Sequence, residues 1–328
     1  MSRDKQRLAN SAFTVRPISD TVPPDLQWLR SDEHAKAVQF DYDTAFSRNL
    51  GWVTPEEQRA LRRKRVAIAG LGGVGGLHLL TLTRLGIGRF HIADFDRFDL
   101  SNFNRQVGAS MRTLGRPKVD VMMELAHDVN PDAEIVAFDA GVTPQNVDAF
   151  LRDVDVLVDG LDFFAFAARE LVFAACYERQ IPAVTAAPLG MGAALLNFIP
   201  GRMSFADYFG FAHCPDEDKP LRFLLGLAPA VLHRSYLADA SFVDLAAGRG
   251  PSTSMACEAC AAVAGSEALK LLLGRGRVIA APRGVHFDCF QNRVVHTWRP
   301  GGWRNPLQRI VTALARRDFA KRAAGTPK

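Results

Sequence analysis

The sequence RVAIAGLGGVGG, at residues 65–76, decides how this chain folds. Its first five residues are short, β-branched and apolar in character, as in a strand that is buried on both faces of a sheet. A glycine-rich loop follows, and residues 77–85 then form an apolar run that is typical of a helix. A strand, a glycine loop and a helix in this order predict the first unit of an α/β fold.

The loop contains a Gly-x-Gly-x-x-Gly pattern at Gly70, Gly72 and Gly75, with Gly73 inside it. Glycines let the backbone turn sharply and approach a phosphate, and the helix that follows presents unpaired N–H groups and the positive end of its dipole. Asp94 ends the next expected strand, where it could hydrogen-bond a ribose hydroxyl. These features suit ATP and NAD equally, and a purely structural glycine turn is the remaining alternative.

Further along the chain, strand-like runs alternate with helical runs. Strands are expected over residues 65–69, 89–93, 134–138 and 154–158, and from 183 onward; helices are expected over 55–65, 77–85, 118–129, 143–151 and 164–179. This alternation predicts an α/β fold with a doubly wound, Rossmann-like, mostly parallel sheet and right-handed crossovers. Ligands of such sheets bind beyond the carboxyl ends of the strands.

The chain has 328 residues, about the size at which a single core stops growing. We expect an N-terminal arm over residues 1–40, one nucleotide-binding domain over 41–300, and a basic C-terminal tail over 301–328. Within the domain, residues 201–254 should cross over the sheet as a long loop with helical pieces. Two regular elements should follow: a helix over 257–273 closed by Gly274, and a C-terminal hairpin over 284–298.

The composition is that of a folded globular protein, with 48% hydrophobic and 23% charged residues. Because the first ten residues are polar and charged, we expect no signal peptide. Five scattered cysteines favour a reducing, cytoplasmic location. The most apolar stretch, residues 181–200, is interrupted by prolines and glycines, so we expect no membrane partner. The basic tail is better explained by a solvated helix than by nucleic-acid binding.

The segment DFDRFDLSNFNRQ, at residues 94–106, is more specific than the glycine loop. It resembles the ThiF/MoeB/HesA family, relatives of the ubiquitin-activating enzymes, whose loop after the second strand carries Asp-x-Asp and then Ser-Asn-x-x-Arg-Gln. The resemblance continues with GRPK at residues 115–118 and with DGLD at residues 159–162. It is good from about Asp41 to Pro200, and weaker through residues 257–273 and the final hairpin.

The resemblance implies an ATP-dependent adenylyltransferase, which activates a carboxylate as an acyl-adenylate and releases pyrophosphate. The carboxylate would be the C-terminus of a ubiquitin-like or sulfur-carrier protein or of a peptide, and a small acid is the remaining alternative. Because the carboxylate and ATP are both anions, catalysis would rest on positioning and charge neutralisation. The implied cofactors are ATP and Mg²⁺.

The resemblance also implies roles for individual residues. The nucleotide would be bound by Gly70, Gly72, Gly73, Gly75, Asp94, Asp96, Asn102, Arg105 and Lys118. Arg105 and Lys118 would also be catalytic, since their cations suit phosphates, and Asp162 would be catalytic as the Mg²⁺ ligand. Arg48 would reach the phosphates of the neighbouring subunit in a homodimer, whose interface we expect from residues 257–273 and 181–200.

The chain departs from the family at three places. Phe163 stands where the family often has Asn after the metal-binding Asp. Only one Cys-x-x-Cys pair is present, Cys257 and Cys260, in a helical sequence, so we expect no structural zinc, although Cys214 and Cys289 could complete four thiolates. Members that form a thioester carry a cysteine in the crossover region; here Cys214 is adjacent to acids that raise a thiol pKa, which disfavours that role.

Several alternatives stay open at this point. An NAD(P)-dependent oxidoreductase explains the glycine loop but not Arg105, Lys118 or Asp162. A non-catalytic, nucleotide-gated interaction protein of the same fold is the second alternative, and a relative of the RNA-modifying dehydratases is a third. For the individual residues, the alternatives are surface ion pairs for Arg105 and Lys118, and the cap of the following helix for Asp162.

Overall fold

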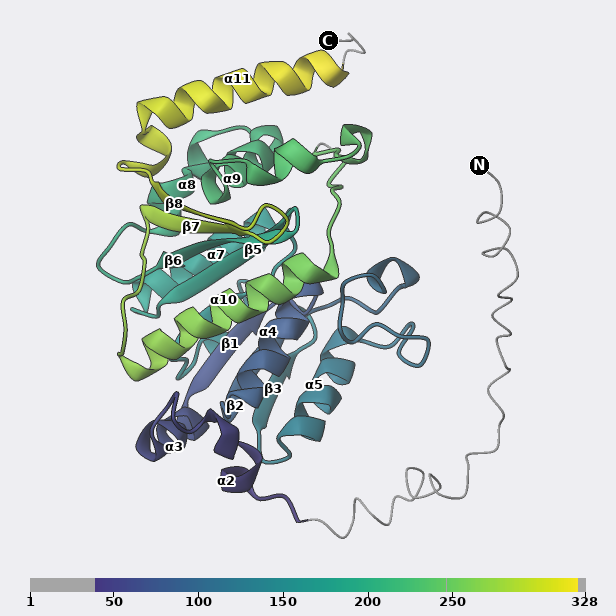
Figure 1. The fold of residues 1–328 in the computed structure, drawn as a ribbon, viewed down its shortest axis with the longest axis vertical. Coiled ribbons are helices and arrows are strands. Elements are labelled where there is room, and N and C mark those ends of the chain that lie inside the picture. The colour runs from purple at the N-terminus through teal and green to yellow at the C-terminus, as the bar shows by residue number, and fades with distance from the viewer. Residues whose placement is uncertain (1–38, 246, 324–328) are drawn as a thin grey trace, which may run out of the picture. The chain divides into compact units, whose positions relative to one another are not determined.

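The fold is described by a computed structural model, which covers residues 39–245 and 247–323. Figure 1 shows one twisted sheet with helices on both faces. Nearly all of the predicted N-terminal arm, residues 1–40, lies outside the described residues, so the arm stays a prediction.

Within the described residues, eight strands form one sheet in the order β3-β2-β1-β4-β5-β6-β7-β8. The strands are β1 Arg65–Ala69, β2 Arg89–Ala93, β3 Glu134–Phe138, β4 Val156–Asp159, β5 Ala183–Leu189, β6 Gly192–Phe198, β7 Arg283–Asp288 and β8 Arg293–Trp298. Strands β1 to β5 pair in parallel and β6 to β8 in antiparallel, which confirms the predicted Rossmann-like fold and the hairpin. Since β2 and β4 flank β1, the strand order reverses at the carboxyl end of β1, where ligands of such sheets bind.

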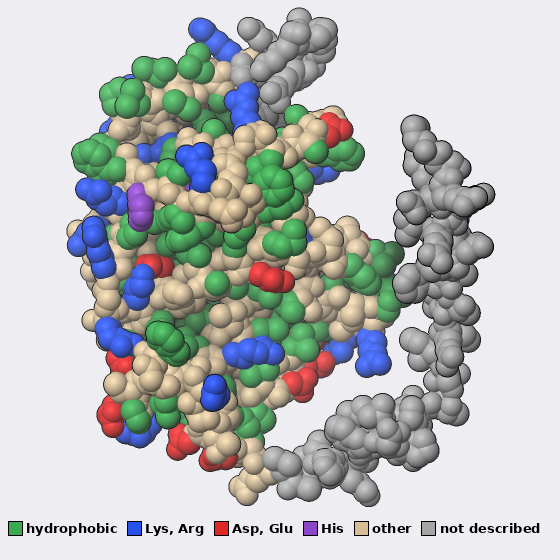
Figure 2. Space-filling model, viewed as in Figure 1, with side chains coloured by type: hydrophobic (Ala, Val, Ile, Leu, Met, Phe, Trp, Pro, Cys, Tyr) green, Lys and Arg blue, Asp and Glu red, His purple; other side chains and the backbone are tan. Residues whose placement is uncertain are grey.

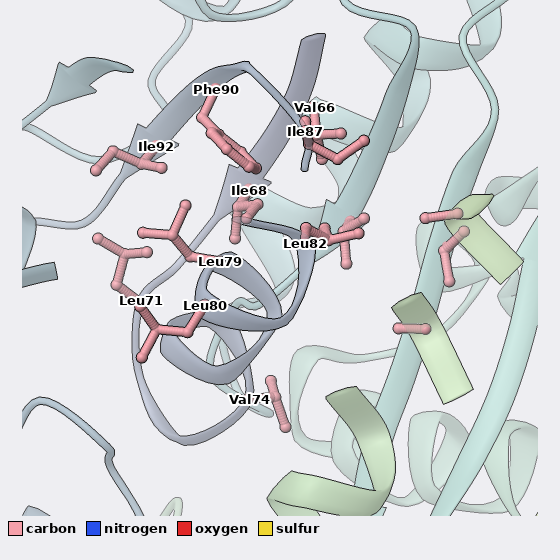
Figure 3. Close-up of a cluster of buried hydrophobic side chains, with 14 of the residues drawn as sticks. Val66, Ile68, Leu71, Val74, Leu79, Leu80, Leu82, Ile87, Phe90 and Ile92 are labelled. Atoms are coloured by element: carbon pink, nitrogen blue, oxygen red, sulfur yellow. The ribbon is translucent and has the colours of Figure 1, made fainter. Parts of the chain in front are cut away.

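Helices cover both faces of this sheet. One face carries α4 Gly73–Arg84, α5 Lys118–Val129 and α10 Ser254–Leu273; the other carries α6 Val147–Phe150, α7 Phe166–Glu178, α8 Phe205–Phe209 and α9 Lys219–Leu227. Alternate side chains of β1 enter the two cores. Val66 and Ile68 pack with Leu79 and Leu82 of α4, as Figure 3 shows, whereas Ala67 packs into the core on the opposite face.

Three glycines let the loop after β1 touch the loop after β4. Gly70 has a left-handed φ of +86°, and a Cβ there would lie 2.3 Å from the carbonyl oxygen of Gly160. A Cβ on Gly75 would lie 1.8 Å from the carbonyl oxygen of Gly70, and one on Gly160 would lie 2.4 Å from that same oxygen. No side chain fits at these contacts, so the first turn of α4 packs directly on the ends of β1 and β4.

Some boundaries differ from the prediction. The helix expected from residue 77 begins at Gly73, because tertiary packing holds the glycines of the loop in helical conformation despite their low helix propensity. The helix expected over 143–151 is only the short α6, and Thr143 does not cap it: its backbone N–H donates to Oδ1 of Asn146 instead. The strand expected over 154–158 lies at 156–159.

Two N-terminal helices, α2 Tyr42–Ala45 and α3 Pro55–Arg63, lie at the end of α4 that is opposite to the glycine loop. The helix predicted over 55–65 is therefore confirmed. The hydroxyl of Tyr42 donates to the carbonyl oxygen of Gly86, just beyond α4, at 2.5 Å. Thr54 and Glu57 close the start of α3 with a capping box.

The crossover region is a long loop with helical pieces, as predicted, and α8 and α9 are its main helices. Aromatic rings anchor it to the sheet. The ring of Phe209 lies 4.7 Å from that of Phe205 and 5.0 Å from that of Phe223, measured between centroids. Phe205 in turn lies 5.4 Å from Phe198 of β6, so the crossover region shares the core of this sheet face.

The basic tail contains the helix α11, Pro306–Ala323, which packs near α9, and Arg316 of α11 forms an ion pair with Asp218, the residue before α9. Its outward face carries exposed apolar residues, among them Leu307, Ile310 and Leu314. In the part of the chain that the structure describes, no helix combines the length and the apolar character needed to span a membrane.

The segments expected to form a dimer interface are buried in the chain's own core. Residues 181–200 form β5 and β6, whose side chains are almost all buried within the sheet. The helix α10 packs Cys257, Cys260, Ala264 and Ala268 into the core beside α4. Residues 181–200 and the inward face of α10 are therefore not available to a partner chain, whereas the outer face of α10, where Met255 is exposed, leaves that part of the expectation untested.

The glycine contacts predict unequal effects of two alanine substitutions. Gly75→Ala places a methyl group against backbone that cannot yield, so we expect it to lower the free energy of unfolding by about 3 kcal/mol. Gly72→Ala is the matched control, because its nearest neighbour would be Nε2 of Gln106 at 3.8 Å. Urea unfolding of both variants measures the difference; equal stability would contradict the packing described for Gly75.

Candidate functional site

The carboxyl ends of β1 and β4 converge on the glycine loop and the start of α4. Gly72, the N-cap of α4, provides no side-chain hydrogen bond to the first turn. The N–H groups of that turn are therefore left for an outside partner, and the helix dipole favours an anion there. The predicted Gly70, Gly72, Gly73 and Gly75 all lie in this loop and turn.

Asp94 shapes the glycine loop. Its Oδ2 accepts the backbone N–H of Leu71 at 2.7 Å, and its Oδ1 accepts that of Asp96 at 2.8 Å. Asp94 is buried at the end of β2. The carboxylate thus ties the loop after β1 to the loop after β2, and the ribose contact that we expect from it would use remaining lone pairs.

Lys118 is the first residue of α5 and is only 5% exposed. Its Nζ lies 3.0 Å from Oδ2 of Asp96, whose side chain is 52% exposed, and its backbone N–H donates to the carbonyl oxygen of Asp96. A buried ammonium with one half-exposed carboxylate partner differs from an ordinary surface ion pair. The cation stays at the edge of the site, with donors to spare for a phosphate.

Arg105 lies against the glycine loop. A Cβ on Gly73 would be 3.5 Å from the Cγ of Arg105. The guanidinium donates to the carbonyl oxygen of Ser101 and to Oδ1 of Asn104, both at 2.9 Å. Within the described residues, no carboxylate forms an ion pair with Arg105, so the surface-pair alternative receives no support.

Asn102 and Gln106 complete this loop. Asn102 is buried, and its Oδ1 accepts the backbone N–H of Asp99 at 3.0 Å, which makes it a loop-shaping residue. Gln106 is also buried, its Nε2 faces Gly72, and its Oε1 has no hydrogen-bond partner in the described part of the chain. The sequence reasoning omitted Gln106 from the site, although the Arg-Gln pair it quoted already contained the signal.

Asp162 lies on the loop after β4 and is exposed. Its Oδ1 accepts the backbone N–H of Phe164 at 2.9 Å, so it does cap the turn that precedes α7. Among the described residues, nothing pairs with the second oxygen, which remains available to a cation. A single free carboxylate oxygen fits a Mg²⁺ ion that takes its other ligands from phosphates and water.

Arg169 was missed by the sequence reasoning. It lies in α7 and forms an ion pair with Asp159 at 2.9 Å, and both side chains are 2% exposed. The hydroxyl of Thr185 donates to the same carboxylate at 2.8 Å. The available signal was an arginine in the middle of the apolar run 164–179, because a charge on a buried helix face needs a buried partner.

Arg48 does not join this site in its own chain. It is exposed in a turn over Ser47–Asn49, and Nδ2 of Asn49 donates to the carbonyl oxygens of Arg84 and Leu85 at the C-terminus of α4. The glycine loop is at the other end of this helix, whose 12 residues span about 18 Å.

The cysteines fall into separate places. Cys257 and Cys260 are buried in the core on the α4 face of the sheet, whereas Cys214 packs against the core on the other face. Cys214 therefore cannot complete a zinc site with them, and the described residues contain no group of three or more metal-ligating side chains. Burial raises the pKa of Cys214, and also that of Cys257.

Residues 46–309 match the model of the ThiF family, which is well over half of the chain. The chain belongs to the ThiF family. The resemblance drawn from residues 94–106, 115–118 and 159–162 is thereby confirmed.

Three curated relatives illustrate the range of this family. HesA (vegetative) of Trichormus variabilis is 37% identical over 146 residues, which are 44% of this chain and 54% of HesA. The tRNA threonylcarbamoyladenosine dehydratase of Bacillus subtilis is 34% identical over 150 residues, 45% of this chain and 57% of that protein. The sulfur carrier protein ThiS adenylyltransferase of Escherichia coli is 32% identical over 143 residues, which are 44% of this chain and 56% of that protein. The chain spans about half the length of these relatives.

Solved structures share the fold. E. coli MccB with ATP has a TM-score of 0.58 at 17% identity, over 87% of this chain and 81% of MccB. E. coli TcdA, the tRNA N6-threonylcarbamoyladenosine dehydratase, in complex with ATP has a TM-score of 0.52 at 22% identity, over 73% of this chain and 98% of TcdA. At these identities, the likeness concerns the fold alone.

His78 of α4 is buried near Asp159, and we predict that it weakens the fold in acid. Burial lowers the pKa of His78 to about 4, against an opposing effect of Asp159. The folded state keeps the ring neutral, whereas the unfolded chain binds a proton below about pH 6.5. The stabilisation is therefore complete above pH 6.5 and is lost as the pH falls toward 4.

Between pH 7 and pH 5, the free energy of unfolding of the wild type should fall by about 2 kcal/mol more than that of His78→Leu. Urea unfolding at both pH values measures this difference. Equal losses in the two proteins would show that His78 is not held neutral by the fold.

Proposed function

We propose that the protein is an ATP-dependent adenylyltransferase. The observation that carries this proposal is the gathering of Arg105 and Lys118 around the glycine loop and the open N-terminus of α4. An oxygen of a carboxylate attacks the α-phosphorus of ATP, the bond from that phosphorus to the bridging oxygen breaks, and pyrophosphate leaves. The products are an acyl-adenylate and pyrophosphate.

The proposed chemistry needs positive charge where the phosphoryl oxygens and the leaving group gain negative charge. Lys118 supplies an ammonium that Asp96 orients, and Arg105 supplies a planar guanidinium with several donors. The first turn of α4 adds N–H groups that need no reorganisation. When bound, Mg²⁺ would neutralise phosphate charge, and Asp162 is the residue of this chain that would hold it.

The proposed substrate is the C-terminal carboxylate of a small carrier protein or peptide. This proposal is supported by the similarity to the sulfur carrier protein ThiS adenylyltransferase and to the structure of E. coli MccB with MccA. A tRNA-linked carboxylate, suggested by the name of the dehydratase relatives, is the second candidate. Family membership, together with the cations beside the glycine loop, favours an adenylyltransferase acting on either substrate over an NAD(P)-dependent oxidoreductase.

We also propose that the protein acts as a homodimer with shared sites. Arg48 lies about a helix length from its own glycine loop, so it can act on a nucleotide only in a second copy. Exposed apolar residues lie beside Arg48, at Trp52, and on the loop after β2, at Phe95 and Met111. Figure 2 shows hydrophobic side chains scattered among basic ones on the face in view. The large exposed side chains of Trp52, Phe95 and Met111 support a symmetric interface.

Lys118→Met should weaken ATP binding by about tenfold, which corresponds to about 1.4 kcal/mol. Lys64→Met is the matched control: Lys64 also pairs with an acid, Asp155, at 2.7 Å, but it precedes β1 at the opposite edge of the sheet. Calorimetric titration with ATP and with NAD compares the three proteins. Binding of NAD without binding of ATP would overturn the adenylyltransferase proposal.

Mixing two inactive variants tests the shared site. Arg48→Ala and Lys118→Ala homodimers should each release little pyrophosphate, since each site lacks one cation. After subunit exchange, a mixed dimer contains one site with both residues, so up to half of the mixed dimer's sites should recover. Absence of recovery despite exchange shown by labelled subunits, or a monomer by light scattering, would refute the arrangement.

A further inference from the structure

The buried arginine of α7 has an unusual set of partners. Besides its ion pair with Asp159, Arg169 donates from Nη2 to the carbonyl oxygens of Leu161 and Asp162, both at 2.9 Å. Its Nη1 donates to the carbonyl oxygen of Phe163 at 3.3 Å. One guanidinium thus holds three consecutive carbonyls of the loop that carries Asp162.

The same loop is held from its other side by Asp159. The Oδ1 of Asp159 accepts the backbone N–H of Leu161 at 3.1 Å, while Oδ2 takes Nε of Arg169 and the hydroxyl of Thr185 from β5. Carbonyls and N–H groups of the loop are therefore both bound to one buried ion pair. Fully satisfied buried networks of this kind fix a single conformation of the backbone they contact.

The ion pair also touches the crossover region. The guanidinium carbon of Arg169 lies 4.7 Å from the ring centroid of Phe223 in α9, and the ring of Phe163 lies 5.0 Å from the same ring. A guanidinium over an aromatic face is held electrostatically. Phe223 therefore couples the loop of Asp162 to a segment that is far from it in sequence.

We infer that Arg169 is a positioning residue that sets the Mg²⁺-binding carboxylate of Asp162, and that Phe223 makes this setting depend on the crossover region. The inference rests on the proposed function, because it assigns the regulation of the same nucleotide site. Arg169 touches neither nucleotide nor metal in this scheme; it acts through the backbone of residues 161–163. The crossover region then controls how strongly Mg²⁺ improves ATP binding.

The test is calorimetric titration with ATP, once with MgCl₂ and once with EDTA. The wild type should bind ATP more tightly with Mg²⁺. Arg169→Gln should lose at least fivefold of this enhancement, while its affinity in EDTA changes less than twofold, because the glycine loop, Arg105 and Lys118 are intact. Arg169→Lys should retain only part of the Mg²⁺ enhancement, since an ammonium cannot hold three carbonyls and Asp159 together.

Two further variants test whether a loss of the Mg²⁺ enhancement results only from loss of the fold. Arg169→Gln leaves Asp159 buried and unpaired, so the double variant Asp159→Asn with Arg169→Gln removes both charges and should fold as judged by its melting curve. It should still lack the enhancement. Arg179→Gln is the matched control and should leave the enhancement unchanged, because Arg179 directly follows α7, at the end opposite to the Asp162 loop, and pairs with Asp148.

The link to the crossover region is tested by Phe223→Leu against Phe205→Leu. Both rings belong to the same aromatic cluster, but only Phe223 lies under Arg169. Phe223→Leu should reduce the Mg²⁺ enhancement by two- to threefold, and Phe205→Leu should not.

The outcomes separate this inference from the proposed function. A wild type that binds no ATP under either condition overturns the proposed function and the inference with it. A wild type that shows the enhancement, together with a folded double variant that keeps it, overturns the inference alone. Equal effects of Phe223→Leu and Phe205→Leu would overturn the coupling to the crossover region.

Discussion

The close approach of two backbone segments, the loop after β1 and the loop after β4, is the constraint on which the rest of the site depends. Gly70, Gly75 and Gly160 leave no room for a side chain between them. Their contact places the start of α4 over the gap between two strands and aims its N–H groups out of the sheet. Arg105 lies directly against this loop, and Lys118 is linked to it through Asp96 and Asp94.

The charges of the site divide into two kinds. Asp94, Asp159 and Arg169 are buried, and each is bound by backbone groups or by a partner, so they fix the shape of the loops. Arg105 and Asp162 are less buried and retain unused donors or acceptors, while Lys118 lies between the two kinds. Rigid, satisfied charges thus support a few unsatisfied ones, as electrostatic preorganisation requires.

The fold could be predicted from sequence where a short apolar run must be a strand buried on both faces of the sheet, as for β1 before its glycine loop. The site was predictable where motif residues follow strand ends, because parallel strands bring those ends together. Arg169 could not be predicted as part of the site, because an arginine within a helical sequence does not indicate which strand carries its acidic partner at its end. The apolar character of α10 did not indicate a partner chain, because its apolar face packs on its own sheet.

The start of α4 shows a further limit of local reasoning. Propensity places glycines outside a helix, yet residues 73–76 are helical because packing against Gly160 and Met122 holds them. The place of Arg48 in the turn at Ser47–Asn49 depends on tertiary contacts of Asn49 with the end of α4, which the local sequence does not encode.

The central claim is that the site joins a carboxylate to AMP, and exchange of labelled pyrophosphate into ATP tests it most directly. The assay combines the protein, ATP, MgCl₂ and a panel of carrier-protein C-termini, peptides and small acids, with Asp162→Asn as the control. The account predicts that label enters ATP only when a suitable carboxylate is present, and that Asp162→Asn loses this exchange while its melting curve is unchanged. Conversion of ATP to ADP and phosphate, with no exchange for any carboxylate, would contradict it.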